Sequence, residues 1–181
     1  NAEKLPFAMP SFDLNGKVAV VTGGTKGLGY GIVMVFAYHG AKVVITSRHQ
    51  EDCDVVAAEV AAMGGEAMGI KADVQNVEEI QNLVDRTVEK YGRLDIMVNN
   101  AGVAVTRRLT DMTEADYERV IDSNLKSVYF GAQIAAKQMI AQGEGGKIIN
   151  MCSIGGIKGN NQLSIYGASK AGAINLTKSM A

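Results

Sequence analysis

The sequence has little cysteine and lacks a long apolar run. Its two cysteines, Cys53 and Cys152, lie far apart among 181 residues and match neither a zinc-ligand spacing nor a disulfide framework. It contains no run of about 18 apolar residues that could form a membrane-spanning helix and no recognisable secretory signal. These absences predict a reduced, cytoplasmic protein without a membrane partner.

An excess of charge of one sign is also absent. The net charge is −1 and 20% of the residues are charged, so the composition does not favour binding to nucleic acid or an anionic membrane. We therefore expect a small-molecule partner. His49 and Cys53 stand four residues apart, as two metal ligands on a helix do, but no further ligands accompany them and no metal site is predicted.

The length suits a single domain. Residues 1–16, which contain Pro6 and Pro10, are predicted to be an N-terminal leader, and 17–181 to be a Rossmann-fold domain. In that domain, short β-branched runs alternate with longer helical patterns. Strands are expected at 17–22, 41–46, 66–71, 94–98 and 146–151, and helices at 27–39, 50–63, 76–91, 113–141 and from 164 to the end.

This alternation predicts βαβ units and a parallel sheet. The runs 18–21 and 96–98 are continuously apolar, as expected of strands that helices cover on both faces. The expected fold class is α/β: a Rossmann-type, doubly wound parallel sheet in three α/β/α layers with strand order 3-2-1-4-5. Ligands of such sheets bind beyond the carboxyl ends of the strands.

A glycine-rich turn, Thr-Gly-Gly-Thr-Lys-Gly-Leu-Gly at 22–29, follows the first expected strand and opens the first helix. Glycine lets the backbone turn tightly and approach a pyrophosphate, and a helix N-terminus offers unpaired N–H groups to an anion. An ordinary strand-to-helix turn also uses glycine. The position at the first βα turn favours a phosphate-binding site.

The end of the second strand indicates which dinucleotide is preferred. NAD sites usually place a carboxylate there for the adenosine ribose, whereas this strand ends in Ser47 and Arg48, and Glu51 and Asp52 come later, at a helix start. Lys26 and Arg48 are suited to bind the 2′-phosphate of NADP. NADP(H) is therefore favoured over NAD, although both cations also suit a solvated surface.

Tyr166 and Lys170 are four residues apart in an expected helix and so share one face. A tyrosine with its usual pKa of about 10 is a poor acid–base group at neutral pH, and a neighbouring ammonium lowers that pKa. Taken alone, such a pair occurs by chance in many helices.

Several motifs together resemble the short-chain dehydrogenase/reductase family. They are, in order, the glycine turn, the run Asn-Asn-Ala-Gly at 99–102, Asn124, Ser153 and Tyr-Gly-Ala-Ser-Lys at 166–170. The resemblance covers 14–181 and is close to the branch of 3-oxoacyl-(acyl carrier protein) reductases, gluconate 5-dehydrogenases and glucose 1-dehydrogenases. It implies an NADP(H)-dependent enzyme that interconverts a ketone, of 3-oxoacyl or sugar/polyol type, and a secondary alcohol.

The resemblance also implies the role of each site residue. Tyr166 is the general acid in reduction and the general base in oxidation, and Ser153 donates a hydrogen bond to the substrate oxygen. Lys170 binds the nicotinamide ribose and lowers the Tyr166 pKa, and Asn124 holds a water chain that returns protons. The implied cofactor contacts are Gly23, Thr25, Lys26, Gly27, Leu28, Gly29, Ser47, Arg48, Asp73, Val74, Asn100, Ala101, Gly102, Tyr166 and Lys170.

Two further expectations concern neighbouring parts of the structure. Within those contacts, Asp73 and Val74 are expected at the adenine, and Asn100, Ala101 and Gly102 along the middle of the cofactor. Asn99 is expected to tie neighbouring strands together.

Family members continue beyond the Tyr-x-x-x-Lys helix with further strands and a segment that covers the substrate, whereas this sequence stops at Ala181. We therefore expect an incomplete sheet on the C-terminal side. The alternative function is a nucleotide-binding module, or an inactive fragment, without turnover.

A homo-oligomer, either a dimer or a tetramer, is expected from the same resemblance. In relatives the two helices near 113–141 and after 164 form a four-helix interface with a second subunit. The residues expected to supply these contacts are Ile134, Ala135, Met139, Ala171, Ile174 and Lys178. The alternative is that these residues pack inward and the protein is monomeric.

Overall fold

The computed structural model describes residues 12–181. The strands are β1 (Val18–Thr22), β2 (Lys42–Ser47), β3 (Glu66–Lys71), β4 (Ile96–Asn99) and β5 (Lys147–Asn150). The α-helices are α1 (Gly27–Tyr38), α2 (Gln50–Ala62), α3 (Val77–Tyr91), α4 (Glu114–Ile121), α5 (Ser127–Ala141) and α6 (Ser164–Met180). Short helical turns lie at η1 (Leu109–Asp111), η2 (Asp122–Lys126) and η3 (Ile154–Gly156).

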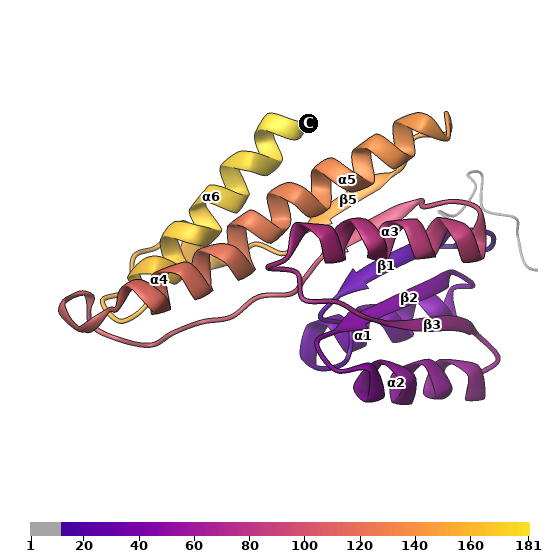
Figure 1. Cartoon of the computed structure of the whole chain (residues 1–181), viewed down its shortest axis with the longest axis horizontal. Helices are drawn as coiled ribbons and strands as arrows, with labels where there is room; N and C mark the ends of the chain where they lie inside the picture. The colour runs from indigo at the N-terminus through magenta and orange to yellow at the C-terminus, as the bar shows by residue number, and fades with distance from the viewer. Residues whose placement is uncertain (1–11) are drawn as a thin grey trace, which may run out of the picture.

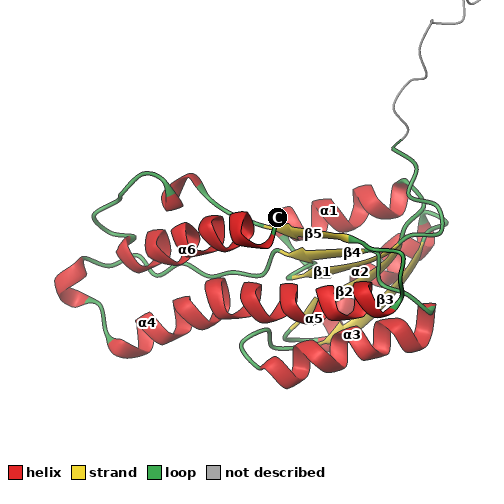
Figure 2. Cartoon of the chain, turned by 90° about the horizontal axis from the view of Figure 1, so that it is seen from above, coloured by secondary structure: helices red, strands yellow, loops and turns green. Residues whose placement is uncertain are grey.

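The five strands form one parallel sheet in the order β3-β2-β1-β4-β5, as predicted. Every residue of β1 and β4 is buried, because helices cover both faces of the sheet. One face packs against α1 and α2 through Val33, Val56 and their neighbours. The other packs against α3 and α5 through Leu83, Ile134 and theirs, so the molecule has the three predicted layers (Figures 1 and 2).

The helix expected at 113–141 is interrupted in the structure. It begins with a reciprocal capping box between Thr113 and Asp116, but η2 is a π-helical turn between α4 and α5. Asn124 lies in this turn and is fully buried. Single π-helical turns inside α-helices frequently mark functional sites, and this one places the predicted catalytic Asn124.

The expected subunit contacts on α5 are wrong for three residues. Ile134, Ala135 and Met139 are buried in the core beneath α5, because they lie on the face that packs against the sheet and α3. They are therefore not available to a second subunit. On α6, Ala171 and Lys178 are exposed, and Ile174 is half-buried.

Residues 1–11 of the predicted leader lie outside the described residues. Contacts with the domain begin before residue 17, since the Leu14 amide donates to the His39 carbonyl at 2.8 Å and the Leu14 side chain packs against the core.

Candidate nucleotide and catalytic site

A cavity of about 390 Å³ opens where the turns after β1, β2, β3 and β4 meet, beyond the carboxyl ends of the strands. The predicted cofactor contacts among its lining residues are Gly23, Thr25, Lys26, Leu28, Gly29, Ser47, Arg48, Asp73, Val74, Asn100, Ala101 and Gly102. Gly27, Tyr166 and Lys170 are the predicted contacts that do not line it. Turns far apart in the sequence thus form one site.

Glycine is required at two points of the turn after β1. Gly23 and Gly27 have φ angles of 62° and 57°, in the left-handed region that favours glycine. A Cβ on Gly29 would coincide with the Gly23 carbonyl oxygen and would crowd the Asn100 side chain. The first turn of α1 contains no acidic residue, so its N–H groups and positive dipole end remain suited to an anion.

Thr22 and Asn100 hold this turn against the end of β4. The Thr22 hydroxyl accepts hydrogen bonds from the backbone amides of Asn100 at 2.9 Å and Ala101 at 3.0 Å. The Asn100 side-chain amide donates to the carbonyls of Thr22 at 2.8 Å and Gly23 at 3.2 Å. Asn100 therefore holds the glycine-rich turn at 22–29 in place, in addition to lining the cavity.

The rim of the cavity carries the cations that the sequence suggested. Lys26 and Arg48 both line it, and among the described residues neither forms an ion pair with a carboxylate. Asp52, assigned only to the dipole of the next helix, stands in the first turn of α2 and also lines the cavity. The Ser47 hydroxyl donates to the His49 carbonyl at 2.9 Å.

Sequence reasoning missed six residues of the lining: His49, Asp52, Ala72, Gln75, Val103 and Ser123. Four of them directly adjoin a predicted contact, so extending each predicted turn by one residue finds His49, Ala72, Gln75 and Val103. Ser123 adjoins Asn124, and its hydroxyl accepts a hydrogen bond from the Gln75 side chain at 2.8 Å. That bond joins the turn after β3 to η2, and no sequence motif predicts it.

Ser153 and Tyr166 come together around Gly155. A Cβ atom on Gly155 would lie 3.4 Å from Ser153 Oγ and 3.3 Å from a ring carbon of Tyr166. Both side chains therefore border the same small space. The Ser153 hydroxyl accepts from the Gly155 amide at 3.1 Å and caps η3. The structure thus brings together these two residues, although they come from a loop and from α6.

Lys170 lies on the inner side of this pair. Its Nζ donates to the Met151 carbonyl at 2.6 Å and stands 6.0 Å from the centroid of the Tyr166 ring. Only 5% of the Lys170 surface is exposed, and this burial holds the pKa of its ammonium below the usual range. The hydrogen bond to Met151 therefore holds the Lys170 amine beside the Tyr166 ring.

Asn124 and Gly102 connect this cluster to the nucleotide cavity. A Cβ atom on Gly102 would lie 3.1 Å from Asn124 Oδ1 and 3.7 Å from Lys170 Nζ. The Asn124 carboxamide accepts from the Val103 amide at 2.8 Å and donates to the Val103 carbonyl at 2.9 Å and to Ser169 Oγ at 3.1 Å. Its side chain thus holds the loop after β4 in place against α6.

The predicted tie by Asn99 is present. Its side-chain amide donates to Asn150 Oδ1 at 2.8 Å, which links β4 to β5. Gly131 of α5 leaves the room that the Asn99 carboxamide occupies.

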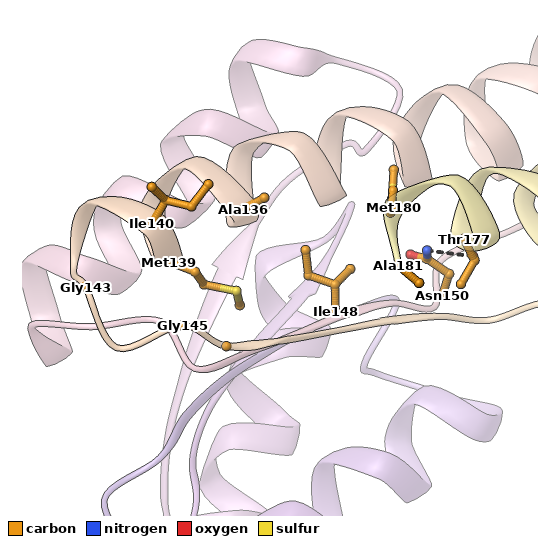
Figure 3. A pocket seen from close by; sticks show the side chains of 11 residues that line it. Ala136, Met139, Ile140, Gly143, Gly145, Ile148, Asn150, Thr177, Met180 and Ala181 are labelled. Atoms are coloured by element: carbon orange, nitrogen blue, oxygen red, sulfur yellow. Dashed lines mark hydrogen bonds between the residues drawn. The ribbon is translucent and has the colours of Figure 1, made fainter.

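A second, larger cavity of about 540 Å³ lies between α5, α6 and β5 (Figure 3). Its lining contains no charged side chain and is formed mainly by glycine, alanine and apolar residues such as Met139, Ile148 and Met180. It offers no acid–base or anion-binding group. The candidate site is therefore taken as the smaller cavity together with the cluster of Ser153, Tyr166 and Lys170.

A doubly wound sheet with a glycine-lined cavity at the carboxyl ends of its strands defines a dinucleotide-binding α/β protein. The comparisons with known proteins narrow this class. The family model described as short chain dehydrogenase matches residues 17–181. The chain belongs to the short-chain dehydrogenase/reductase family and is an oxidoreductase that acts on CH–OH groups.

Individual relatives and solved structures are similar to the chain over most of its length. The chain is 38% identical over 169 residues to a Synechocystis 3-oxoacyl-[acyl-carrier-protein] reductase, with 93% of this chain and 68% of the relative covered. It is 39% identical over 173 residues to the 2-dehydro-3-deoxy-D-gluconate 5-dehydrogenase of Escherichia coli, with 96% and 68% covered. A metagenomic short-chain oxidoreductase solved in complex with NADP has a TM-score of 0.88 and 37% identity, with 93% and 76% covered.

Among residues 12–181, no helix combines the length and apolar character that crossing a membrane requires.

Proposed function

We propose that this chain is an NADP(H)-dependent oxidoreductase that interconverts a ketone and a secondary alcohol by hydride transfer, with Tyr166 as the acid–base group. The observation that carries the proposal is the position of Gly102. This residue lines the nucleotide cavity, and a Cβ atom on it would lie 3.1 Å from Asn124 Oδ1 and 3.7 Å from Lys170 Nζ, so the predicted catalytic cluster adjoins the cavity.

The residues of the cavity suit such a cofactor. Gly29 lets the turn pack directly on the Gly23 carbonyl, and the first turn of α1 lines the cavity, where its N-terminus would bind the pyrophosphate. Lys26 and Arg48 would bind the 2′-phosphate, and the NADP bound to a solved relative supports the same choice. When bound, a reduced nicotinamide supplies the hydride that is added to the carbonyl carbon.

The side chains of the cluster have distinct roles in this proposal. Tyr166 gives its phenolic proton to the carbonyl oxygen in reduction, and the phenolate takes the proton back from the alcohol in oxidation. The Ser153 hydroxyl donates to the same oxygen as negative charge develops there. The Lys170 ammonium stabilises the Tyr166 phenolate by its charge and would bind the nicotinamide ribose.

Asn124 contributes chiefly by position. Its carboxamide is fully engaged with Val103 and Ser169, so it keeps the loop at Val103 at the edge of the cavity. The water chain assigned to Asn124 stays a prediction. The contacts with Val103 and Ser169 give the carboxamide a structural role.

For the substrate, we propose a 3-oxoacyl or sugar/polyol ketone. Relatives with these activities are more than a third identical to the chain. The loop at 103–108 begins at Val103, which lines the cavity, and the loop at 154–163 follows Ser153. The Arg107 amide donates to the Gln162 carbonyl at 2.9 Å, which ties the two loops together.

The decisive experiment is a spectrophotometric NADPH-oxidation assay over a panel of 3-oxoacyl thioesters and keto sugars, with Tyr166→Phe as the variant. The variant should lose at least about 100-fold of the rate, since general acid catalysis is typically worth that much or more, and should keep its affinity for NADPH. A variant that retains more than about a tenth of the rate contradicts the role of Tyr166. A wild-type chain that binds NADPH without turnover supports the alternative function, a nucleotide-binding module.

We also propose that residues 17–181 form one domain and that the protein is a homo-oligomer. With three residues of α5 buried, the contact to a second subunit would use the exposed sides of α5 and α6, including Tyr129 and Ala171. Light scattering at micromolar concentration tests this, and a monomer is the contradicting result.

A further inference from the structure

A chain of polar side chains runs from β4 through β5 to α6. The Asn99 side-chain amide donates to Asn150 Oδ1 at 2.8 Å, and Asn150 Nδ2 donates to the Thr177 hydroxyl at 3.0 Å. Thr177 in turn donates to the Ala173 carbonyl at 2.7 Å. Figure 3 shows the bond between Asn150 and Thr177 at one end of the apolar groove between α5 and α6.

This bond connects α6, which carries Tyr166 and Lys170, to the strand that leads into the Ser153 loop. Asn150 ends β5 and precedes Ser153 by three residues. Thr177 follows Lys170 by seven residues, two turns of α6, and therefore lies on the helix face that carries Tyr166 and Lys170. A rotation of α6 about its axis that moves Thr177 away from Asn150 would also move the Tyr166 phenol relative to the Ser153 hydroxyl.

A second bond holds the same helix to the same segment of chain. Lys170 Nζ donates to the carbonyl of Met151, the residue after Asn150. The two bonds are two helical turns apart, and a helix fixed at two points along one face cannot rotate freely. The oxygen of the Asn150 carboxamide is already occupied by Asn99, which leaves its nitrogen directed to Thr177.

We propose that the Asn150–Thr177 hydrogen bond positions α6 for catalysis by fixing the rotation of the Tyr166 phenol relative to Ser153. Thr177 is a positioning residue and does not touch the reacting atoms. This inference rests on the proposed function of Tyr166 and Ser153. Nothing in the family motifs that led to the site points to Asn150 or Thr177.

The test compares four proteins: the wild type, Thr177→Val, Thr177→Ser and Ser179→Ala. Valine has the shape of threonine without the hydroxyl, and serine keeps the hydroxyl. Ser179 is the matched control, because among residues 12–181 its hydroxyl bonds only to the Asn175 carbonyl of its own helix. For each protein we would measure kcat and KM with the best ketone of the panel, and NADPH affinity by fluorescence.

In Thr177→Val we expect kcat to fall about tenfold or more, because small displacements of an acid–base group have large effects on rate. NADPH affinity should change little, since Lys170 keeps its own bond to Met151. Thr177→Ser and Ser179→Ala should behave like the wild type. A wild-type kcat in Thr177→Val, or an equal loss in Ser179→Ala, would overturn the inference.

Hydrogen exchange of residues 164–172 separates failure of this inference from failure of the proposed function. If the wild type is inactive on every ketone, the proposed function is refuted but the positioning role of Thr177 is not. Hydrogen exchange then tests that role. Exchange should be faster in Thr177→Val than in the wild type and unchanged in Thr177→Ser. Equal exchange in all three proteins overturns the positioning role.

Discussion

At the rim of the nucleotide cavity, the charge of a few side chains determines the proposed cofactor preference. Arg48 and Lys26 bring positive charge, and Asp52 brings a carboxylate to the same lining. We propose NADP because Arg48 directly follows the end of β2, where NAD sites place their carboxylate. Asp52 comes from the next helix.

Replacing Arg48 with Asp should therefore weaken NADPH binding by about tenfold to a hundredfold, the value of one or two charge-assisted hydrogen bonds. NADH binding should improve or stay unchanged, since a carboxylate accepts from a ribose hydroxyl. Fluorescence titration with both cofactors measures this. Arg86→Asp on α3 is the matched control, with the same change of charge away from the cavity. Equal affinities for both cofactors in the parent protein would contradict the prediction.

A second group of charged residues lies at the amino ends of the strands, on the side of the sheet opposite the cavity, where Asp95 directly precedes β4. The Asp95 carboxylate accepts from the Val18 amide at 2.9 Å and from two nitrogens of Arg93 at 2.6 and 2.8 Å. Burial raises the pKa of the Asp95 carboxyl, but the hydrogen bonds from Arg93 and Val18 outweigh it, so this pKa lies below its usual range.

Because the Asp95 pKa is lower in the folded state, its stabilisation is complete above the unfolded pKa of about 3.9 and is lost as the pH falls through the folded pKa. Asp95→Asn should cost about 1 to 3 kcal/mol of unfolding free energy at pH 7. The cost should shrink at pH 3. Urea unfolding at both pH values measures it. The exposed Asp85, which accepts only from Gln81 of its own helix, provides the control Asp85→Asn, and a cost independent of pH would contradict the assignment.

At the scale of elements, the turn that opens α1 depends on glycine only at particular positions. Gly29 packs directly on the Gly23 carbonyl, whereas Gly31, two residues later in the same helix, has open space where its side chain would be. The same substitution therefore has opposite consequences at the two positions.

Gly29→Ala should abolish measurable NADPH binding and lower stability, because the turn must open to admit the methyl group. Gly31→Ala should raise stability by about 0.5 to 1 kcal/mol, since alanine is the better helix former, with binding unchanged. Thermal unfolding and cofactor titration of both variants measure this. Wild-type binding by Gly29→Ala would show that the close packing of Gly29 on the Gly23 carbonyl is not required.

The helices and strands were largely predictable, because the hydrophobic periodicity and the positions of the glycines indicate the same element boundaries. Every strand and helix lies within two residues of its expected bounds, except where η2 interrupts the helix at 113–141. That interruption was not predictable, because the apolar pattern continues through it. The contact between Asn150 and Thr177 was not predictable either, because only the tertiary fold brings these two residues together.

At the scale of the whole molecule, cofactor binding should stabilise the fold. A ligand at about 100 times its Kd adds about 2.7 kcal/mol of unfolding free energy, which for a domain of this size raises Tm by about 5 to 10 °C. NADPH should produce a larger shift than NADH at equal concentration, and Arg48→Asp should remove the difference. Differential scanning fluorimetry measures it without any need for turnover. Equal shifts with both cofactors would contradict the preference.

The sheet order also determines how the chain can assemble. β1, β2 and β3 are consecutive in sequence and adjacent in the sheet, so their pairing requires only local βαβ crossovers. Pairing of β1 with β4 joins Val20 to Met97 and closes a long loop, which is entropically costlier and slower. During synthesis the amino-terminal half emerges first, so we expect the phosphate turn to form before α6 exists. We therefore expect α6, with Tyr166 and Lys170, to dock onto a cavity whose four strands have already paired.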